Sequence, residues 1–339
     1  MKNYEIIVPN RLVLISSIED LKLEKLDLSD VDECIIRMAG CRYGEPLCLM
    51  LLATKIRRLW ERFPETKFGL STSQSDFRGY ADYIGFFRFM GFNRGNSPGV
   101  ALGSTNYTPI TIFDIDQLIS DAGAEPIGLH VSKIIVGLAQ NLAQENEGPV
   151  YDLMEYSLRE IIRNAAEHSR GKQIAVLGQC WPAKQTAEIV VMDNGVGIAE
   201  NLYDNEYLEC ETNAQALKFA MMPGVTGVSL SERIDQDDHW GNSGFGLYVT
   251  SRFCSENGSF RVISGKNGLT LSNGNQVEHD WSYDGTCVQL RLSFDDAKSK
   301  VDRISEIIDE GTLVHKETIS DYPINASVAS QLLASNFKK

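Results

Sequence analysis

The stretch from Tyr151 to Ser169, YDLMEYSLREIIRNAAEHS, decides the fold of the second half of this chain. Its apolar residues recur at spacings of three and four, which predicts a half-buried helix. Glu160 and Asn164 lie four positions apart, so their side chains project from one face, and His168 comes a turn later. A carboxylate and a carboxamide beside an apolar stripe are typical of a metal–phosphate site, where the amide binds Mg²⁺ and the carboxylate serves as a base. A solvated helix face carries the same pattern, so the interpretation depends on the motifs located further along the chain.

Two glycine motifs lie C-terminal to this helix. Asp193, Gly195 and Gly197 form an Asp-x-Gly-x-Gly sequence directly after the apolar run 189–192, which is typical of a buried strand. Residues 241–247, GNSGFGL, then open a second helix-like segment. Glycine lets the backbone approach a ligand closely, and the start of a helix offers free N–H groups to a phosphate. The pattern predicts a site that can bind a phosphate group.

A last motif, Gly285-Thr286, precedes another apolar strand. The order of these four motifs resembles the GHKL superfamily of ATPases, which includes gyrase, Hsp90, MutL, histidine kinases and anti-sigma serine kinases. The resemblance covers residues 151–294, and the stretch 160–168 is most similar to the anti-sigma kinase branch. It implies a Bergerat-type α/β sandwich, in which helices cover one face of a mixed sheet.

The resemblance also implies ATP and Mg²⁺ as cofactors and gives the motif residues their roles. Glu160 would be the general base, Asn164 the protein ligand of Mg²⁺, and His168 a polar residue near the phosphates. Asp193 would accept a hydrogen bond from the amino group of adenine. The other expected nucleotide-binding residues are Gly195 and Gly197 under the base, Gly244, Phe245, Gly246 and Leu247 around the phosphates, and Thr286 beside Asp193.

Residues 199–240 lie where this superfamily has a lid over the nucleotide. A helix is expected over 212–222, ended by a Pro-Gly pair. Lys218 and Arg233 are both candidates for a contact with the γ-phosphate, although a solvated surface position is the default interpretation for each. Asn242 stands where many relatives have glycine, which is expected to stiffen the hinge of the lid.

The composition describes an acidic protein of two domains. The chain has 339 residues, a net charge of -14 and 43% hydrophobic residues. The acidity argues against nucleic-acid binding, which needs clustered Lys and Arg. No apolar run approaches the length of a membrane span, and the first ten residues lack a signal-peptide pattern. A cytoplasmic, bacterial protein is expected. Three of the seven cysteines, Cys34, Cys41 and Cys48, are spaced by seven, and buried reduced thiols are favoured over a metal site.

Residues 1–92 alternate between strand-like and helix-like segments. Strands are expected at 4–8, 12–15, 26–38 and 67–71, and helices at 48–60 and 76–90. The sequences LDLSDVDECII and YIGFFRFMGF, with a helix after Gly44-Glu45-Pro46, resemble STAS-like domains of anti-sigma antagonists and sulfate transporters. Antagonists place a phosphorylatable Ser or Thr before the first helix. Here residues 41–46 offer only Tyr43, so a fixed scaffold or a partner-binding role is expected.

The remaining segments give the domain limits 1–92 (STAS-like), 93–125 (connecting segment), 126–294 (GHKL) and 295–339 (helical tail). A strand is expected at 110–113 and helices at 126–142 and 295–310. His130 in the first of these helices lacks the acceptor box of a histidine kinase, so an ordinary helix histidine is favoured. An aromatic cluster is interpreted as core or interface: Tyr80, Tyr83, Phe86, Phe87, Phe89 and Phe92.

The favoured function is Mg²⁺-dependent ATP binding with slow hydrolysis, used as a conformational or assembly switch. The second hypothesis is a protein serine/threonine kinase of the anti-sigma type. A histidine kinase is a third, disfavoured by the missing acceptor box, and a non-enzymatic nucleotide sensor is a fourth. A protein partner is expected to bind the N-terminal domain, and a nucleotide-dependent homodimer is left open.

Overall fold

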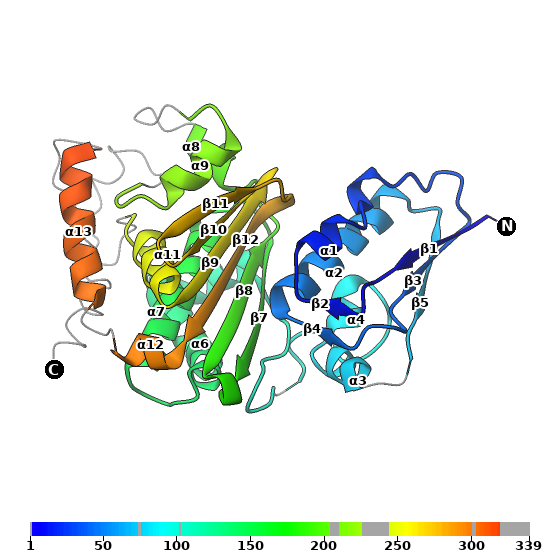
Figure 1. The fold of residues 1–339 in the computed structure, drawn as a ribbon, viewed down its shortest axis with the longest axis horizontal. Helices are drawn as coiled ribbons and strands as arrows, with labels where there is room; N and C mark the ends of the chain where they lie inside the picture. Colours follow the sequence, from blue (N-terminus) through cyan, green and yellow to red (C-terminus); the bar gives the residue numbers. More distant parts are fainter. Residues whose placement is uncertain are drawn as a thin grey trace. The chain divides into compact units, whose positions relative to one another are not determined.

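The computed structural model describes residues 2–73, 76–101, 103–203, 210–225, 244–299 and 303–318. The chain forms two compact units, residues 1–112 with 177–179, and residues 113–176 with 180–339 (Figure 1). Helices and strands are mixed in both, which confirms the α/β fold class. The domain limits at 92, 125 and 294 stay predictions beside these units, as does the STAS-like assignment.

The first unit contains a parallel three-stranded sheet in the order β1-β3-β5. The register pairs Ile6 with Ile36, and both side chains are buried. The predicted strand at 12–15 is wrong beyond Leu12, because a helix begins at Ser16. The strands of this unit are β1 (Asn3–Ile7), β2 (Arg11–Leu12), β3 (Glu33–Arg37), β4 (Tyr43–Gly44) and β5 (Lys67–Ser71).

The helices of the first unit correct one prediction. The single helix expected over 76–90 is two helices, because Gly85 has a φ of 83°, a left-handed value that helical residues do not adopt. The aromatic side chains Phe86, Phe87 and Phe89 lie in the core, as expected. The helical segments are α1 (Ser16–Glu19), η1 (Leu23–Lys25), α2 (Pro46–Arg62), α3 (Asp76–Tyr83) and α4 (Phe86–Met90).

The three evenly spaced cysteines are free and buried, as predicted. Burial raises the pKa of the Cys34 and Cys41 thiols to about 11, so both stay protonated at neutral pH. Among the residues described by the structure, no three His, Cys, Asp or Glu side chains gather as a metal site. These cysteines act as small apolar core residues.

The second unit is built on a seven-stranded sheet with the order β11-β10-β9-β12-β8-β7-β6. Strands β8 and β12 are antiparallel neighbours, with Met192 opposite Cys287, so Asp193 at the end of β8 lies close to Thr286. The strands are β6 (Thr111–Asp114), β7 (Gln173–Trp181), β8 (Thr186–Asp193), β9 (Gly258–Gly265), β10 (Asn267–Ser272), β11 (Asn275–His279) and β12 (Tyr283–Ser293).

Helices α6, α7 and α11 lie against one face of this sheet (Figure 1). Their apolar side chains and those of the strands form one core cluster, which includes Tyr156, Phe253 and Phe260. The helical segments are α5 (Ile115–Ala122), α6 (Ile127–Ala143), α7 (Pro149–His168), η2 (Pro182–Lys184), α8 (Ile198–Tyr203), α9 (Asn213–Ala220), α11 (Gly246–Glu256), α12 (Phe294–Ser299) and α13 (Arg303–Thr318).

Helix α7 is the predicted helix of the decisive stretch. Pro149 stands in its first turn, where a missing N–H costs no hydrogen bond, and Asp152 complements the positive helix start. Leu153, Leu158 and Ile162 are almost fully buried, so the apolar stripe holds this helix against the sheet. Its last turn carries the polar residues of the candidate site.

The C-terminal helix expected at 295–310 is described as two helices, α12 and α13, on either side of residues 300–302. Helix α13 packs on α11 at Gly311, where a Cβ would lie 2.5 Å from the ring of Tyr248. Within the described ranges, no helix combines the length and the apolar character needed to cross a bilayer.

Candidate functional site

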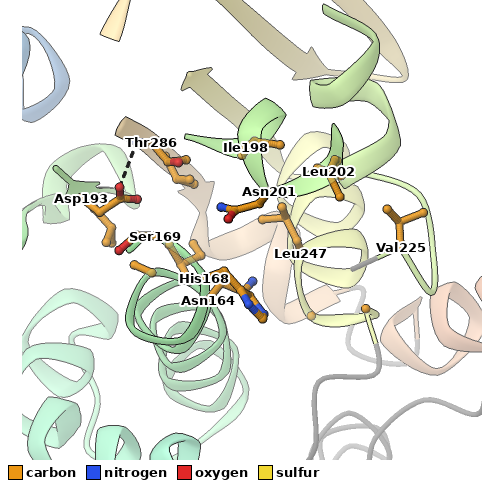
Figure 2. Close-up of a pocket in the computed structure, with 17 residues that line it drawn as sticks. Asn164, His168, Ser169, Asp193, Ile198, Asn201, Leu202, Val225, Leu247 and Thr286 are labelled. Atoms are coloured by element: carbon orange, nitrogen blue, oxygen red, sulfur yellow. Dashed lines mark hydrogen bonds between the residues drawn. The ribbon is translucent and has the colours of Figure 1, made fainter. Parts of the chain in front are cut away.

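A pocket opens between α7, the ends of β8 and β12, α8 and the start of α11 (Figure 2). Its lining residues are Ile161, Asn164, Ala165, His168, Ser169, Val191, Asp193, Ile198, Asn201, Leu202, Ala220, Val225, Gly244, Gly246, Leu247, Thr286 and Val288.

Asp193 is the buried acid of this pocket, with only 4% of its surface exposed. Its Oδ1 accepts hydrogen bonds from the backbone N–H of Gly195, at 2.8 Å, and of Thr286, at 3.3 Å. The side chain of Thr286 also bonds to this carboxylate. Figure 2 shows Asp193 and Thr286 side by side at one end of the pocket. The carboxylate is therefore fixed in direction before any ligand arrives.

The pKa of Asp193 is raised to about 6 by burial, and the hydrogen bonds from Gly195 and Thr286 only partly oppose this shift. At neutral pH the group is ionised and can accept a hydrogen bond from a ligand. Below about pH 6 it becomes a neutral acid, which changes what it can recognise.

Two residues that the sequence did not single out, Tyr283 and Ser264, fix the backbone at and around Asp193. The Tyr283 hydroxyl donates to the backbone carbonyl of Asp193 at 2.9 Å. Ser264 Oγ donates to the carbonyl of Gly285 at 2.8 Å and accepts from the N–H of Ile198 at 2.9 Å. A Cβ on Gly285 would lie 2.3 Å from the Asp193 carbonyl oxygen. These contacts join segments that are distant in sequence. The spacing of residues within a local motif therefore could not predict them.

Asn164 and His168 project from α7 into the pocket (Figure 2). Burial, and to a smaller extent the charge of Arg163, lowers the pKa of His168 to about 4. The imidazole is therefore neutral at pH 7 and offers a hydrogen bond to a ligand, not a positive charge. The amide of Asn164 supplies an oxygen of the kind Mg²⁺ binds.

The start of α11 borders the pocket at Gly244, Gly246 and Leu247. Gly244 has a φ of 70°, and a Cβ there would lie 2.6 Å from the backbone of Gly224, so only glycine fits. The first N–H groups of a helix have no partner within the helix and carry partial positive charge. This end of the pocket therefore suits an anionic group.

Glu160, the expected base, does not line the pocket. Its carboxylate is 1% exposed and lies between two arginines, with Arg163 Nη2 3.0 Å from Oε2 and Arg159 Nε 3.3 Å from Oε1. A Cβ on Gly246 would lie 2.1 Å from Oε2, so the carboxylate touches the start of α11 from beneath.

The described lining residues include no Lys or Arg, although a triphosphate carries several negative charges. Lys218 of α9 forms an ion pair with Glu278 at 2.5 Å, and it does not line the pocket. Arg233 and Asn242 lie outside the described residues, as do residues 204–209 and 226–240 of the expected lid. The helix expected at 212–222 is confirmed as α9, with a capping box from Thr212.

One protein oxygen, from Asn164, fits a magnesium ion that takes its other ligands from phosphates and water, as Mg²⁺ usually does in nucleotide sites. The structure thus brings seven predicted residues to one pocket: Asn164, His168, Asp193, Gly244, Gly246, Leu247 and Thr286. Four other predicted residues do not line it: Glu160, Gly195, Gly197 and Phe245. Lining residues that were not predicted include Ser169, Ile198 and Asn201.

Residues 151–296 match the family model described as histidine kinase-, DNA gyrase B-, and HSP90-like ATPase. The match spans less than half of the chain, and it supports the GHKL superfamily for this part. It implies ATP binding and an ATPase or kinase type of activity. No curated protein and no solved structure matches the chain.

Proposed function

We propose that residues 151–296 bind ATP with Mg²⁺ and hydrolyse it slowly, and that the bound γ-phosphate drives a conformational or assembly switch. One observation carries the proposal. A buried, ionised carboxylate with fixed direction, Asp193, shares a pocket with the carboxamide of Asn164 and a glycine-bordered helix start.

The Asp193 end is the proposed adenine site. An ionised carboxylate accepts a hydrogen bond from the amino group of adenine, whereas guanine presents a carbonyl at the equivalent position and would be repelled. The apolar side chains of Val191, Ile198 and Val288 line the same pocket and offer surfaces for a flat base. Selectivity for adenine over guanine is expected.

The phosphates are proposed to lie between Asn164 and the start of α11. Here Gly244 and Gly246 allow close approach, and the partial positive charge at the start of α11 suits a phosphate. Mg²⁺ held by Asn164, when bound, would neutralise phosphate charge that the described lining residues do not neutralise. Glu160 is the proposed general base, and Gly195, Gly197 and Phe245 support the backbone around the nucleotide.

Calorimetric titration of the whole chain tests this function. Saturable binding of ATP is expected with Mg²⁺, weaker binding with EDTA, and much weaker binding of GTP. Equal affinity for ATP and GTP would contradict adenine reading by Asp193. Absence of ATP binding would overturn the function.

A protein serine/threonine kinase of the anti-sigma type is the second candidate. It is favoured by the sequence of residues 160–168, EIIRNAAEH, which resembles that branch. Transfer within this chain is not expected, because residues 41–46 offer only Tyr43. His130 lies on α6 near Glu125, with 3.8 Å between Nδ1 and Oε2, and has no acceptor box.

ATP labelled in the γ-phosphate separates the two candidates. The switch predicts no label on the purified chain and a change of mass, by light scattering, with a non-hydrolysable analogue. Stoichiometric label on the chain would favour the kinase. Transfer to a protein partner bound by the N-terminal unit would favour it as well.

A further inference from the structure

Five charged side chains run along one face of α7 around Glu160. Arg159 lies 3.2 Å from Glu155, between Nη1 and Oε2, and its Nε lies 3.3 Å from Glu160 Oε1. Arg163 Nη2 lies 3.0 Å from Glu160 Oε2, and its Nε lies 3.7 Å from Glu167 Oε2. Each oxygen of Glu160 thus faces its own guanidinium group. We call these five residues the α7 charge network.

The Glu160 carboxylate is separated from the pocket by the thickness of one backbone segment. Gly246 lines the pocket, and a Cβ on it would lie 2.1 Å from Glu160 Oε2. The carboxylate is therefore near the proposed phosphate end, yet it is 1% exposed and does not line the pocket. A small movement of this side chain would decide whether it reaches the pocket.

A general base must lie within hydrogen-bond reach of the water that it deprotonates. A carboxylate whose two oxygens face guanidinium groups, and which water does not reach, does not meet this condition. Separating a buried ion pair is costly, because the charges lose their compensation in a medium of low dielectric constant. In the observed arrangement Glu160 is therefore not placed to act as a base.

The charge network contacts α6 at two points. Ser132 Oγ donates to Glu155 Oε1 at 2.5 Å. A Cβ on Gly128 would lie 3.2 Å from Arg163 Cδ, so the absence of a side chain at this position makes room for the arginine stem. A shift of α6 along α7 would therefore change how the arginines hold Glu160.

We propose that Arg163 is a positioning residue that, together with Arg159, holds Glu160 in this arrangement and keeps ATP hydrolysis slow. The proposal rests on the proposed function, with Glu160 as its base. A shift of α6 relative to α7 releases the carboxylate toward the pocket. The contacts between α6 and α7 then keep ATP hydrolysis slow, and a change in these contacts would regulate its rate.

The experiment measures turnover at saturating Mg-ATP for Arg163→Met and Arg163→Gln in the whole chain. Arg159 remains in both variants to compensate the buried charge of Glu160. We expect kcat to rise about tenfold, a factor that corresponds to about 1.36 kcal/mol, with the affinity for ATP unchanged. The rise must vanish in the Glu160→Gln background, because it acts through that carboxylate.

A matched control is Arg291→Met. Arg291 pairs with the fully buried Glu188, with 3.4 Å between Nη1 and Oε2, on the sheet and outside the charge network. Its loss is expected to lower the melting temperature without raising kcat. Arg163→Lys, which keeps the charge, is expected to stay close to the parent in turnover.

The outcomes distinguish the proposed role of Arg163 from the proposed ATP binding and hydrolysis. Folded Arg163 variants that hydrolyse ATP no faster than the parent would overturn the positioning role, as would a rise that persists with Glu160→Gln. If the parent binds ATP and needs Glu160 for turnover, the proposed function stands in either case. A parent that binds no ATP would overturn both.

Discussion

The backbone N–H of Thr286 donates to Asp193 Oδ1 at 3.3 Å, although the two residues are 93 positions apart in the chain. The contact exists because β8 and β12 are antiparallel neighbours that bring the end of one strand to the start of the other. Tyr283 fixes the same Asp193 from its carbonyl side. The direction of the carboxylate is thus set by the sheet, which favours recognition by a preorganised group.

Asp193→Asn is expected to stabilise the protein at neutral pH. The folded-state pKa is raised to about 6 from 3.8, so the stabilising contribution of Asp193 is complete below pH 3.8 and is lost as the pH rises through 6. Above that pH the buried charge costs roughly 3 kcal/mol, which the neutral amide avoids. Urea unfolding at pH 8 should show the variant more stable, and the gain should shrink toward pH 4. A less stable variant at pH 8 would contradict the cost assigned to the buried carboxylate.

His168→Gln is expected to reduce the loss of folding stability at acidic pH. The folded-state pKa is lowered from 6.5 to about 4, so the folded state resists the proton that the unfolded state takes up. The contribution is present above pH 6.5 and is lost as the pH falls toward 4, by roughly 3 kcal/mol. Urea midpoints of parent and variant, compared at pH 7 and at pH 4.5, measure it. Parallel losses in the two proteins would contradict a neutral, partly buried imidazole.

Two substitutions on α7 should separate chemistry from binding. Glu160→Ala is expected to keep ATP binding and lower turnover by about 10²–10⁴-fold, the usual contribution of a positioned base. Asn164→Ala should lose the part of the ATP affinity that depends on Mg²⁺. Steady-state hydrolysis and calorimetry with Mg²⁺ or EDTA check both. If both variants hydrolyse ATP as fast as the parent, Glu160 and Asn164 have a structural role and no role in hydrolysis.

Gly285→Ala should displace Asp193 and so disrupt the proposed adenine site. The φ of Gly285 is 110°, and a Cβ would lie 2.3 Å from the Asp193 carbonyl, so backbone must shift. Weaker ATP binding and a lower melting temperature are expected. Gly137→Ala on α6 is the control, because a Cβ there meets nothing within 4 Å and should stabilise the helix. Equal effects of both substitutions would contradict the strain argument.

Local pattern predicted the long elements of the fold. Helix α7 was predicted because its apolar stripe is long and regular, and the strand before Asp193 because it is a continuous apolar run. The break at Gly85 was missed, since a left-handed residue inside a helical pattern cannot be told from an ordinary helical glycine. Helix α5 was missed because residues 93–125 were interpreted as a connecting segment.

The residues of the site that belong to one sequence motif were predicted. Those that reach the site from neighbouring strands of the sheet were missed. The glycine motifs led to Asp193, Gly244 and Gly246, whereas Ser264 and Tyr283 act from neighbouring strands. The arginines beside Glu160 had a signal that went unused. Residues 155 and 159, and residues 163 and 167, form two i, i+4 pairs of opposite charge on either side of the expected base.

The affinity of a folded Asp193→Asn protein for ATP, measured by calorimetry with Mg²⁺, tests the central claim most directly. The carboxylate that accepts a hydrogen bond from adenine is replaced by an amide that keeps the Oδ1 contacts but removes the charge. Loss of a hydrogen bond to a charged group is worth about 1.5–3 kcal/mol, so the account predicts ATP binding about 10- to 100-fold weaker in a protein at least as stable as the parent. Unchanged affinity in that folded variant would contradict adenine recognition at this pocket.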